Sequence, residues 1–227
     1  MTPTGRYRRS ADLPQRIPVF PLRGVILLPR ATLPLNIFEP RYLAMVEDVL
    51  AGSRILGVIQ PERSDGDEES PIGKMVPLRR IGCAGRVTAY QELDDARLGI
   101  TLTGIVRFEV LDEPATAKPY RICHVAYDRY SEDFRSGVGE ERVDRSNLLR
   151  VLKSYLEAHR LRADWRAIQQ APSEVLVNSL SILCPYGPEE KQALLEAADL
   201  KTRAEVLMAL AEMELASSES GSGGALN

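Results

Sequence analysis

The feature that most constrains the fold is an apolar segment broken repeatedly by proline, IPVFPLRGVILLPRATLPLNIFEPRY at residues 17–42. Proline lacks a backbone N–H and its ring clashes with the preceding helical turn, so no continuous helix can form here. We therefore expect no membrane span, despite the apolar content. The segment predicts three short strands, at residues 17–22, 25–28 and 33–38. Turns are expected between them at residues 23–24 and 29–30. Closely spaced short strands with prolines at their ends favour a small, strongly bent barrel over a flat sheet.

Proline and glycine divide the chain into two parts with different expected structure. Twelve of the 15 prolines lie at or before Pro119, whereas Gly187 is the only glycine between residues 140 and 220. The first part therefore predicts strands and turns, and the second predicts helices. We expect an α+β protein, with a mixed β-barrel followed by a small α-helical bundle. The expected boundaries are a disordered basic arm (1–13), the barrel (14–130), a linker (131–142), the helical bundle (143–216) and a flexible tail (217–227).

The clearest strand pattern lies between Ile100 and Val110, where apolar residues and Gly104 occupy every second position. This period places them on one face of a strand. Gly104, in the middle of the pattern, predicts a bend or a β-bulge. Further strands are expected at residues 76–81, 84–93 and 120–127. One early helix is expected after Pro40, because the apolar residues that follow have helical spacing and Gly52 provides a stop.

Apolar stripes at helical spacing predict the bundle in the second part of the chain. One stripe runs from Leu148 to His159, a second from Val175 to Leu183, and a third helix begins near Pro188. Thr202 and Glu205 have the spacing of a capping box, which predicts the start of the last helix. We expect these stripes to pack on one another, with a surface for a partner helix as the alternative.

Charge is nearly balanced, with 29 basic and 32 acidic residues and a formal net charge of −3. A protein devoted to wrapping nucleic acid usually carries a strong basic excess, so this class is disfavoured. The first thirty residues are nevertheless rich in arginine, with Asp12 as their only acid. We interpret this arm as a solvated tail, with contact to an anionic partner as the alternative.

No residue pattern for catalysis, a cofactor or a metal is found. The chain has three widely spaced cysteines, no C-x-x-C pair and no signal segment at its start, which favours a reducing cytoplasm and cysteines packed as small hydrophobes. Cys123 and His124 are adjacent, so a strand directs them to opposite faces. A phosphate-binding G-x-x-x-x-G-K-[ST] loop is absent. The acidic stretch at residues 62–70 does not follow the EF-hand pattern and is interpreted as a solvated loop.

Three separated motifs carry a family resemblance. They are PVFPLRGVILLP and LPLNIFEPRYLAM at 18–29 and 33–45, IGCAGR with LTGIVRF at 81–86 and 102–108, and KQALLE at 191–196. Together they resemble the N-terminal domain of Lon proteases, and especially its stand-alone relatives, over residues 14–215. The resemblance implies a PUA-like barrel with a helical bundle. The ATPase and serine–lysine peptidase modules of full-length Lon proteases have no counterpart in these 227 residues.

The resemblance also implies a function. It suggests a non-enzymatic module that binds unfolded or tagged polypeptide, an adaptor or receptor in protein quality control for which a separate protease is a candidate partner. Candidate polypeptide-binding residues are Phe20, Leu22, Arg23, Phe38, Arg41, Tyr42 and Arg107. The structural alternative is that the apolar members belong to the core and that the arginines fix turns. The alternative function is RNA binding by a PUA-like module, using the arginine-rich arm, but only 6% of the residues are aromatic and the charge is balanced.

Overall fold

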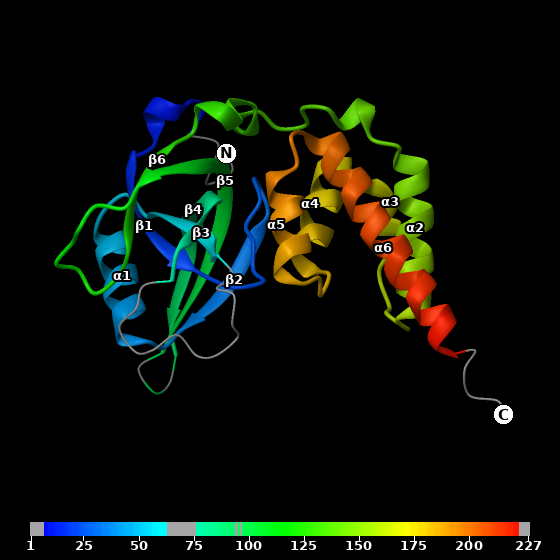
Figure 1. Cartoon of the computed structure of the whole chain (residues 1–227), viewed down its shortest axis with the longest axis horizontal. Helices are drawn as coiled ribbons and strands as arrows, with labels where there is room; N and C mark the ends of the chain where they lie inside the picture. Colours follow the sequence, from blue (N-terminus) through cyan, green and yellow to red (C-terminus); the bar gives the residue numbers. More distant parts are fainter. Residues whose placement is uncertain (1–6, 63–75, 94, 96, 223–227) are drawn as a thin grey trace. The chain divides into compact units, whose positions relative to one another are not determined.

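The computed structural model describes residues 7–62, 76–93, 95 and 97–222 of the chain (Figure 1). The chain forms two compact units. Unit 1 comprises the chain up to Ser136 together with Tyr186–Leu195, and unit 2 comprises Gly137–Pro185 together with the chain from Glu196 onward. The polypeptide therefore leaves unit 1, returns to it for one short helical segment, and leaves it again.

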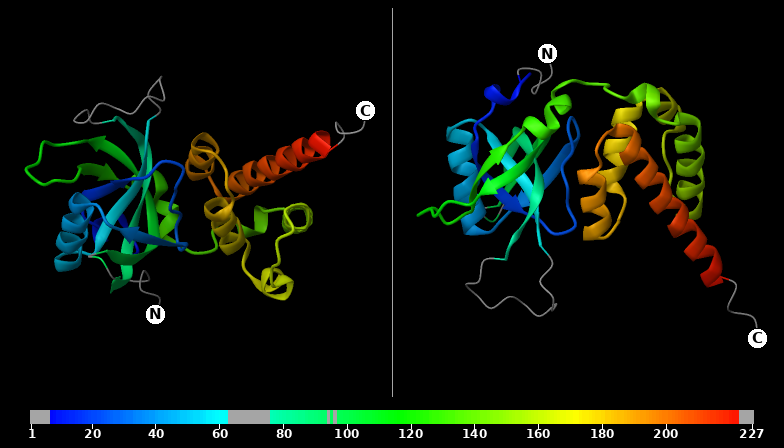
Figure 2. Two further views of the ribbon diagram at one scale, coloured as in Figure 1. Left: turned by 90° about the horizontal axis from the view of Figure 1, so that it is seen from below. Right: turned by 45° about the horizontal axis from the view of Figure 1, so that its top comes forward.

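Unit 1 is built on one mixed sheet. Its strands are β1 (Arg16–Pro21), β2 (Thr32–Ile37), β3 (Ile55–Pro61), β4 (Leu78–Glu92), β5 (Leu98–Asp112) and β6 (Ile122–Ala126). Their order is β2-β5-β4-β3-β1-β6, and β5 also pairs with β6. This last pairing closes all the strands except β2 into a ring, which is visible in Figures 1 and 2. The pairing of β1 with β3 is parallel and the other ladders are antiparallel, so the predicted α+β class with a mixed sheet is confirmed.

The long strand β5 supplies much of the core, as its alternating pattern predicted. Ile100, Leu102, Val106 and Phe108 are buried. The expected irregularity at Gly104 is also present, because the β4–β5 register shifts at this position. A Cβ atom on Gly104 would lie 2.0 Å from the backbone oxygen of Leu28, so only glycine allows the two backbones to approach this closely.

The strand predicted at residues 25–28 is wrong. This segment has no strand assignment, although Ile26, Leu27 and Leu28 are fully buried. It passes against β5 instead, where the backbone N–H of Arg30 donates to the oxygen of Gly104 (2.9 Å). An apolar run predicts burial, but burial without a continuous ladder of backbone hydrogen bonds does not make a strand.

Two further segments of unit 1 are more ordered than expected. Within the predicted disordered arm, Tyr7 is buried and its hydroxyl accepts a hydrogen bond from Arg86 Nη1 (2.9 Å). Within the predicted linker, the 3-10 helix η2 (Asp128–Phe134) places Asp133 against the buried side chain of Arg107. In both cases polar contacts with residues of the sheet hold a segment whose own composition is that of a loop.

The early helix is present as α1 (Pro40–Ala51). Pro40 occupies its first turn, where the missing N–H costs nothing, and Gly52 follows its last residue. Tyr42, Met45 and Val46 lie on the face that is buried against the strands, together with Val49. The expected spacing and stop are therefore confirmed.

Unit 2 consists of helices. They are η3 (Glu140–Arg142), α2 (Arg145–Ala158), α3 (Trp165–Gln170), α4 (Ser173–Leu183) and α6 (Leu200–Ser222). Its core brings together Leu152 and Tyr155 from α2, Val177 from α4 and Leu207 from α6, all buried. Among the residues that the structure describes, no helix combines the length and the apolarity needed to cross a bilayer.

The start and end of α6 differ from expectation. The helix begins at Leu200, and the side chain of Asp199 accepts the backbone N–H of Thr202 (2.8 Å). Asp199 is therefore the N-terminal cap, and the capping box predicted at Thr202 is wrong because Thr202 already lies in the first turn. The helix also continues to Ser222, so its last residues occupy the beginning of the expected tail.

Helix α5 (Pro188–Glu196) was expected in the bundle, but residues 186–195 belong to unit 1. Gln60, buried at the end of β3, accepts a hydrogen bond from the backbone N–H of Gly24 (2.7 Å) and donates to the backbone oxygen of Pro188 (2.9 Å). It also bonds Gln192 Oε1 (3.0 Å), whose own amide donates to Ile81. These buried polar contacts attach α5 to the strands.

Candidate functional site

A surface groove of about 820 Å³ lies in unit 1 beside the first turn of α1. One wall is formed by Arg41 and Tyr42 of α1, and the opposite wall by the β5–β6 connection, residues 113–121 with the exception of Ala117. Pro21 and Pro61, at the ends of β1 and β3, and Val76 complete the lining. We call this surface the α1 groove. Its volume lies within the range of about 300–1,000 Å³ that is typical of ligand sites.

The helical wall is fixed by packing beneath it. Tyr42 is buried and its ring lies 4.3 Å from that of Phe20, centroid to centroid. Burial raises the pKa of the Tyr42 hydroxyl, so the phenol is neutral at physiological pH. The guanidinium of Arg41 lies 4.5 Å above the centre of the Tyr42 ring and 2.7 Å from Glu39 Oε2. Arg41 is thus held in one place while about half of its side chain stays exposed.

The opposite wall is fixed at its base. Glu113 and Arg121 lie at the two ends of the 113–121 connection and form a bidentate ion pair. Arg121 Nε donates to Glu113 Oε1 (2.6 Å), and Arg121 Nη2 donates to Glu113 Oε2. Arg121 Nη1 also donates to the backbone oxygen of Val76 (2.6 Å). Two parallel charge-assisted hydrogen bonds define both distance and orientation, so the ends of this connection are held together.

The same connection is attached to α1 through Asp48. The carboxylate accepts hydrogen bonds from Lys118 Nζ (2.7 Å) and from the hydroxyl of Tyr120 (2.6 Å). These two bonds lower the pKa of Asp48, while burial and the bond to Asp48 raise the pKa of Tyr120 to about 12. Asp48 is therefore a stable anion and Tyr120 a stable donor near neutral pH. The α1 groove is preformed rather than dependent on a ligand for its shape.

The groove has the chemistry of a binding surface. Its lining is dominated by proline, tyrosine and small side chains, and its charged members are engaged in ion pairs. Within the described part of the chain, no cluster of three or more histidine, cysteine or acidic side chains could hold a metal ion. Cys123 is buried, and burial raises the pKa of its thiol to about 11, so it stays protonated and poorly nucleophilic.

The structure brings together two of the seven candidate residues, Arg41 and Tyr42, on the wall of the groove. Phe20 is buried behind Tyr42 and supports that wall. Leu22, Arg23 and Phe38 lie elsewhere, although Phe38 is 66% exposed and Arg23 is exposed. The residues of the 113–121 wall were not among the candidates predicted from the sequence. The available signal was the close spacing of two prolines with Lys118, Tyr120 and Arg121.

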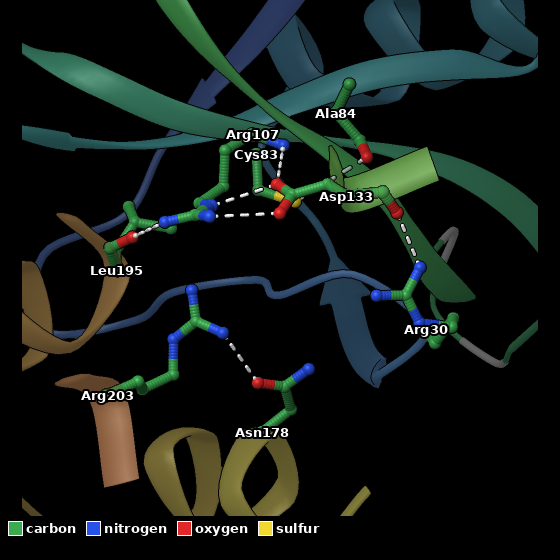
Figure 3. Close-up of polar contacts among 8 residues, drawn as sticks. All are labelled: Arg30, Cys83, Ala84, Arg107, Asp133, Asn178, Leu195 and Arg203. Carbon is green, nitrogen blue, oxygen red and sulfur yellow. Dashed lines mark hydrogen bonds and ion pairs between the residues drawn. The ribbon is translucent and has the colours of Figure 1, made fainter. Parts of the chain in front are cut away.

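Arg107, the remaining candidate, is buried, and its side chain is 4% exposed. Figure 3 shows its polar contacts with Asp133 and Leu195. Its Nε and Nη2 atoms each lie 2.9 Å from an oxygen of Asp133, and Nη1 donates to the backbone oxygen of Leu195 (3.2 Å). The guanidinium also covers the ring of Tyr130, 4.2 Å from its centre. These contacts leave no surface for a polypeptide, so the expected binding role of Arg107 is replaced by the structural alternative.

Buried contacts connect residues of separate sequence motifs. Arg107 of LTGIVRF bonds Leu195 of KQALLE, and Gly24 of PVFPLRGVILLP is joined through Gln60 to Gln192 of KQALLE. These motif residues therefore attach α5 and η2 to the sheet and do not line the α1 groove. Of the motif residues, only Pro21, Arg41 and Tyr42 line the groove.

A model of a known protein family matches most of the chain. The family model described as "ATP-dependent protease La (LON) substrate-binding domain" matches residues 16–212. The chain belongs to this family. The resemblance inferred from the motifs is confirmed, and the match falls within the substrate-binding domain, not the protease or ATPase parts of Lon.

Relatives and solved structures agree with this assignment. The Lon protease of Dictyoglomus thermophilum is 25% identical over 210 residues, which cover 86% of this chain and 24% of that protein. Lon protease 2 of Myxococcus xanthus is 25% identical and is matched over 92% of this chain and 25% of its own length. The chain thus spans about a quarter of the curated relatives that it matches.

Two solved structures share the fold. A Lon N-terminal domain protein from Xanthomonas campestris superposes with a TM-score of 0.59 at 23% identity, covering 86% of this chain and 97% of that one. The N-terminal domain of a Mycobacterium avium complex Lon protease gives a TM-score of 0.61 at 14% identity, covering 87% and 98%. At these identities the comparison supports the fold alone, and it is consistent with the expected PUA-like architecture.

Proposed function

We propose that this protein is a non-enzymatic polypeptide-binding module and that unfolded or tagged polypeptide binds in the α1 groove. The observation that carries the proposal is a preformed groove with a largely apolar lining, held open by ion pairs at its base and at α1. Membership in the substrate-binding domain family supports a polypeptide as the ligand. We further propose that the protein acts as an adaptor or receptor for a separate protease. Its free, buried cysteines suit the reducing cytoplasm that we propose as its location.

The size of the groove sets the expected affinity. Full burial of one leucine or phenylalanine side chain contributes about 1.5–3 kcal/mol, so two such side chains contribute about 3–6 kcal/mol. Immobilising the peptide opposes this contribution. Two buried side chains would alone correspond to a Kd of about 0.04–6 mM, and the cost of immobilisation weakens it, so a short segment should bind with a Kd of about 1 mM or weaker. A long unfolded chain should bind more tightly because several of its segments can occupy the groove.

The test is the fluorescence anisotropy of a labelled, permanently unfolded polypeptide titrated with the protein. The chain offers a matched pair of variants, because Ala115 and Ala117 are both exposed on the same connection but only Ala115 lines the groove. Ala115→Trp should fill part of the groove and weaken binding by about tenfold, the value of one buried side chain. Ala117→Trp should bind like the wild type.

Two outcomes would contradict the proposal. Equal binding by both tryptophan variants would show that polypeptide binds elsewhere. A single-stranded RNA of similar length, titrated in parallel, would reveal the alternative function if it alone bound and if its binding weakened steeply with salt. Polypeptide binding through apolar side chains should instead survive moderate salt.

A further inference from the structure

Helix α3 of unit 2 differs from α2 and α4 in that none of its residues is buried. It lies in the segment 159–172, which joins α2 to α4 (Figure 1). Leu161, just before the helix, is 55% exposed, and Trp165 and Ile168 on the helix are only partly buried. Trp165 and Ile168 are three residues apart, so they are neighbours on one face of the helix. A helix usually buries such a face in the core, and α3 leaves it partly uncovered.

Polar contacts fix α3 at both of its ends. Asp164 caps the first turn by accepting the backbone N–H of Ala167 (3.0 Å). At the other end, Arg145 Nη2 donates to the backbone oxygen of Gln169 (2.8 Å), and Arg145 Nη1 donates to Ser173 Oγ at the start of α4 (3.1 Å). The backbone of α3 is therefore already ordered, and a partner that docks on it would not have to bear the cost of ordering it.

The turn between α2 and α3 is fixed by two backbone hydrogen bonds. The N–H of Leu161 donates to the oxygen of Leu156 (2.9 Å), and the N–H of Arg160 donates to the oxygen of Glu157 (3.1 Å). This is the bonding of a Schellman motif, in which the left-handed position is usually glycine. Here that position is Arg160, with a φ of 53° and an exposed side chain. Arg160→Gly would therefore remove a surface charge while relieving the backbone.

The surface around α3 is basic. The segment from 159 to 171 has three arginines, all exposed, and one acidic residue, Asp164, whose carboxylate is the helix cap. Its charged side chains thus have a positive excess, although the net charge of the whole chain is −3. We call this set of side chains the α3 surface; its members are Leu161, Trp165 and Ile168 with Arg160, Arg162 and Arg166.

We propose that the α3 surface is a docking site for an acidic amphipathic helix of a partner protein. The apolar stripe of that helix would cover Trp165 and Ile168, and its acidic residues would pair with Arg162 and Arg166. Tryptophan and arginine are among the residues that most often carry the binding energy of protein interfaces. The inference goes beyond the proposed function, because the α3 surface belongs to unit 2 and the α1 groove to unit 1. A receptor that acts with a separate protease needs such a second surface.

The experiment uses the intrinsic fluorescence of Trp165. It is the only tryptophan of the chain, so its emission reports on the α3 surface alone. The wild-type protein is titrated with two synthetic helical peptides that lack tryptophan and tyrosine and share one leucine stripe. The other positions are rich in glutamate in one peptide and in lysine in the other. The glutamate peptide should shift the emission to shorter wavelength in a saturable way, because docking removes the indole from water, and the lysine peptide should not.

Variants separate docking from folding and from overall charge. Binding of the labelled glutamate peptide, followed by anisotropy, should weaken by about tenfold or more in Trp165→Ala. Arg162→Gln should weaken it by up to about fivefold, the value of an exposed ion pair, and Arg80→Gln should leave it unchanged. Arg80 is a matched control because it is 74% exposed but lies on β4 in unit 1. Arg160→Gly should weaken binding without lowering the urea midpoint, so that unfolding cannot be the cause.

Four results would overturn the inference. The Trp165 emission could stay unchanged with both peptides, or shift equally with both. It could respond only to vesicles of phosphatidylcholine and phosphatidylserine, which would identify a membrane site. It could change with protein concentration alone, which would identify a second copy as the occupant. Each of these results leaves the proposed function standing, since polypeptide binding in the α1 groove is tested separately by the Ala115→Trp and Ala117→Trp pair.

Discussion

Removal of the Asp133 carboxylate should destabilise unit 1 more than most single substitutions do. Arg107 is 4% exposed and Asp133 11%, and two side-chain hydrogen bonds of 2.9 Å join them. Asp133 also accepts the backbone N–H of Arg107 (3.0 Å). Asp133→Ala would leave a buried guanidinium without its counter-ion, a situation that costs about 3–5 kcal/mol. This is a large part of the 5–15 kcal/mol that is typical of total stability.

The assay is urea unfolding followed by circular dichroism, combined with hydrogen exchange of the amides in α5. The midpoint should fall for Asp133→Ala, and α5 should exchange faster because Arg107 also holds the backbone oxygen of Leu195. The double variant Arg107→Met with Asp133→Leu removes both charges and should recover most of the lost stability. A loss below about 1 kcal/mol for Asp133→Ala, or a double variant less stable than the single one, would show that Asp133 is not needed to balance the buried charge of Arg107.

Substitutions and chemical modification test three other features of the fold and the groove. Gly104→Ala should lower the free energy of unfolding by about 3 kcal/mol or more, because its Cβ would lie 2.0 Å from the backbone oxygen of Leu28. Gly99→Ala, on the same strand, introduces a Cβ that makes only ordinary van der Waals contacts, so its free energy of unfolding should fall far less. The stability of the two variants is compared through their urea unfolding midpoints. Asp48→Asn should weaken polypeptide binding at pH 7 by loosening the 113–121 wall, whereas wild-type binding should stay constant between about pH 5 and pH 8. Wild-type binding is constant over this range because the pKa of Asp48 in the folded protein lies below the usual 3.8. The stabilisation that ionised Asp48 provides is therefore complete above pH 3.8, and it is lost only as the pH falls through the folded-state pKa. Cys123 should resist a thiol-specific reagent in the folded protein near pH 8 and react after unfolding, since burial both shields it and raises its pKa to about 11; mass spectrometry detects the adduct.

The parts of the fold that could be predicted are those in which local pattern and tertiary environment agree. The alternation along β5 predicted its buried face, and Gly104 predicted the irregularity in its pairing. The helical spacing after Pro40 predicted α1 and its stop. The segment at 25–28 was mispredicted because its burial comes from packing against β5, which no local pattern distinguishes from strand pairing.

The assignment of α5 and the capping of α6 failed for a related reason. An apolar stripe on a helix shows that one face is buried but does not identify the surface that covers it, so α5 was predicted in the bundle although Gln60 attaches it to the strands. At α6, two capping residues were available at suitable spacing. Asp199 caps the helix by accepting the backbone N–H of Thr202, so the capping box predicted at Thr202 does not form.

The groove was only half predictable. Arg41 and Tyr42 were identified because they lie in LPLNIFEPRYLAM, one of the motifs that carry the family resemblance. The 113–121 wall depends on hydrogen bonds between residues far apart in sequence, such as Tyr120 with Asp48, and these appear only in the folded chain. Arg107 illustrates the converse, because an arginine within a motif can equally be a buried anchor.

The most direct test of the central claim is to map where an unfolded polypeptide contacts the protein. A permanently unfolded polypeptide carrying a photoreactive group would be bound, irradiated and digested, and the crosslinked residues would be identified by mass spectrometry. We expect crosslinks concentrated on residues 113–121 and on Arg41 and Tyr42, and we expect them to be lost in Ala115→Trp but not in Ala117→Trp. Crosslinks concentrated on the helices of unit 2, or unchanged in Ala115→Trp, would contradict it.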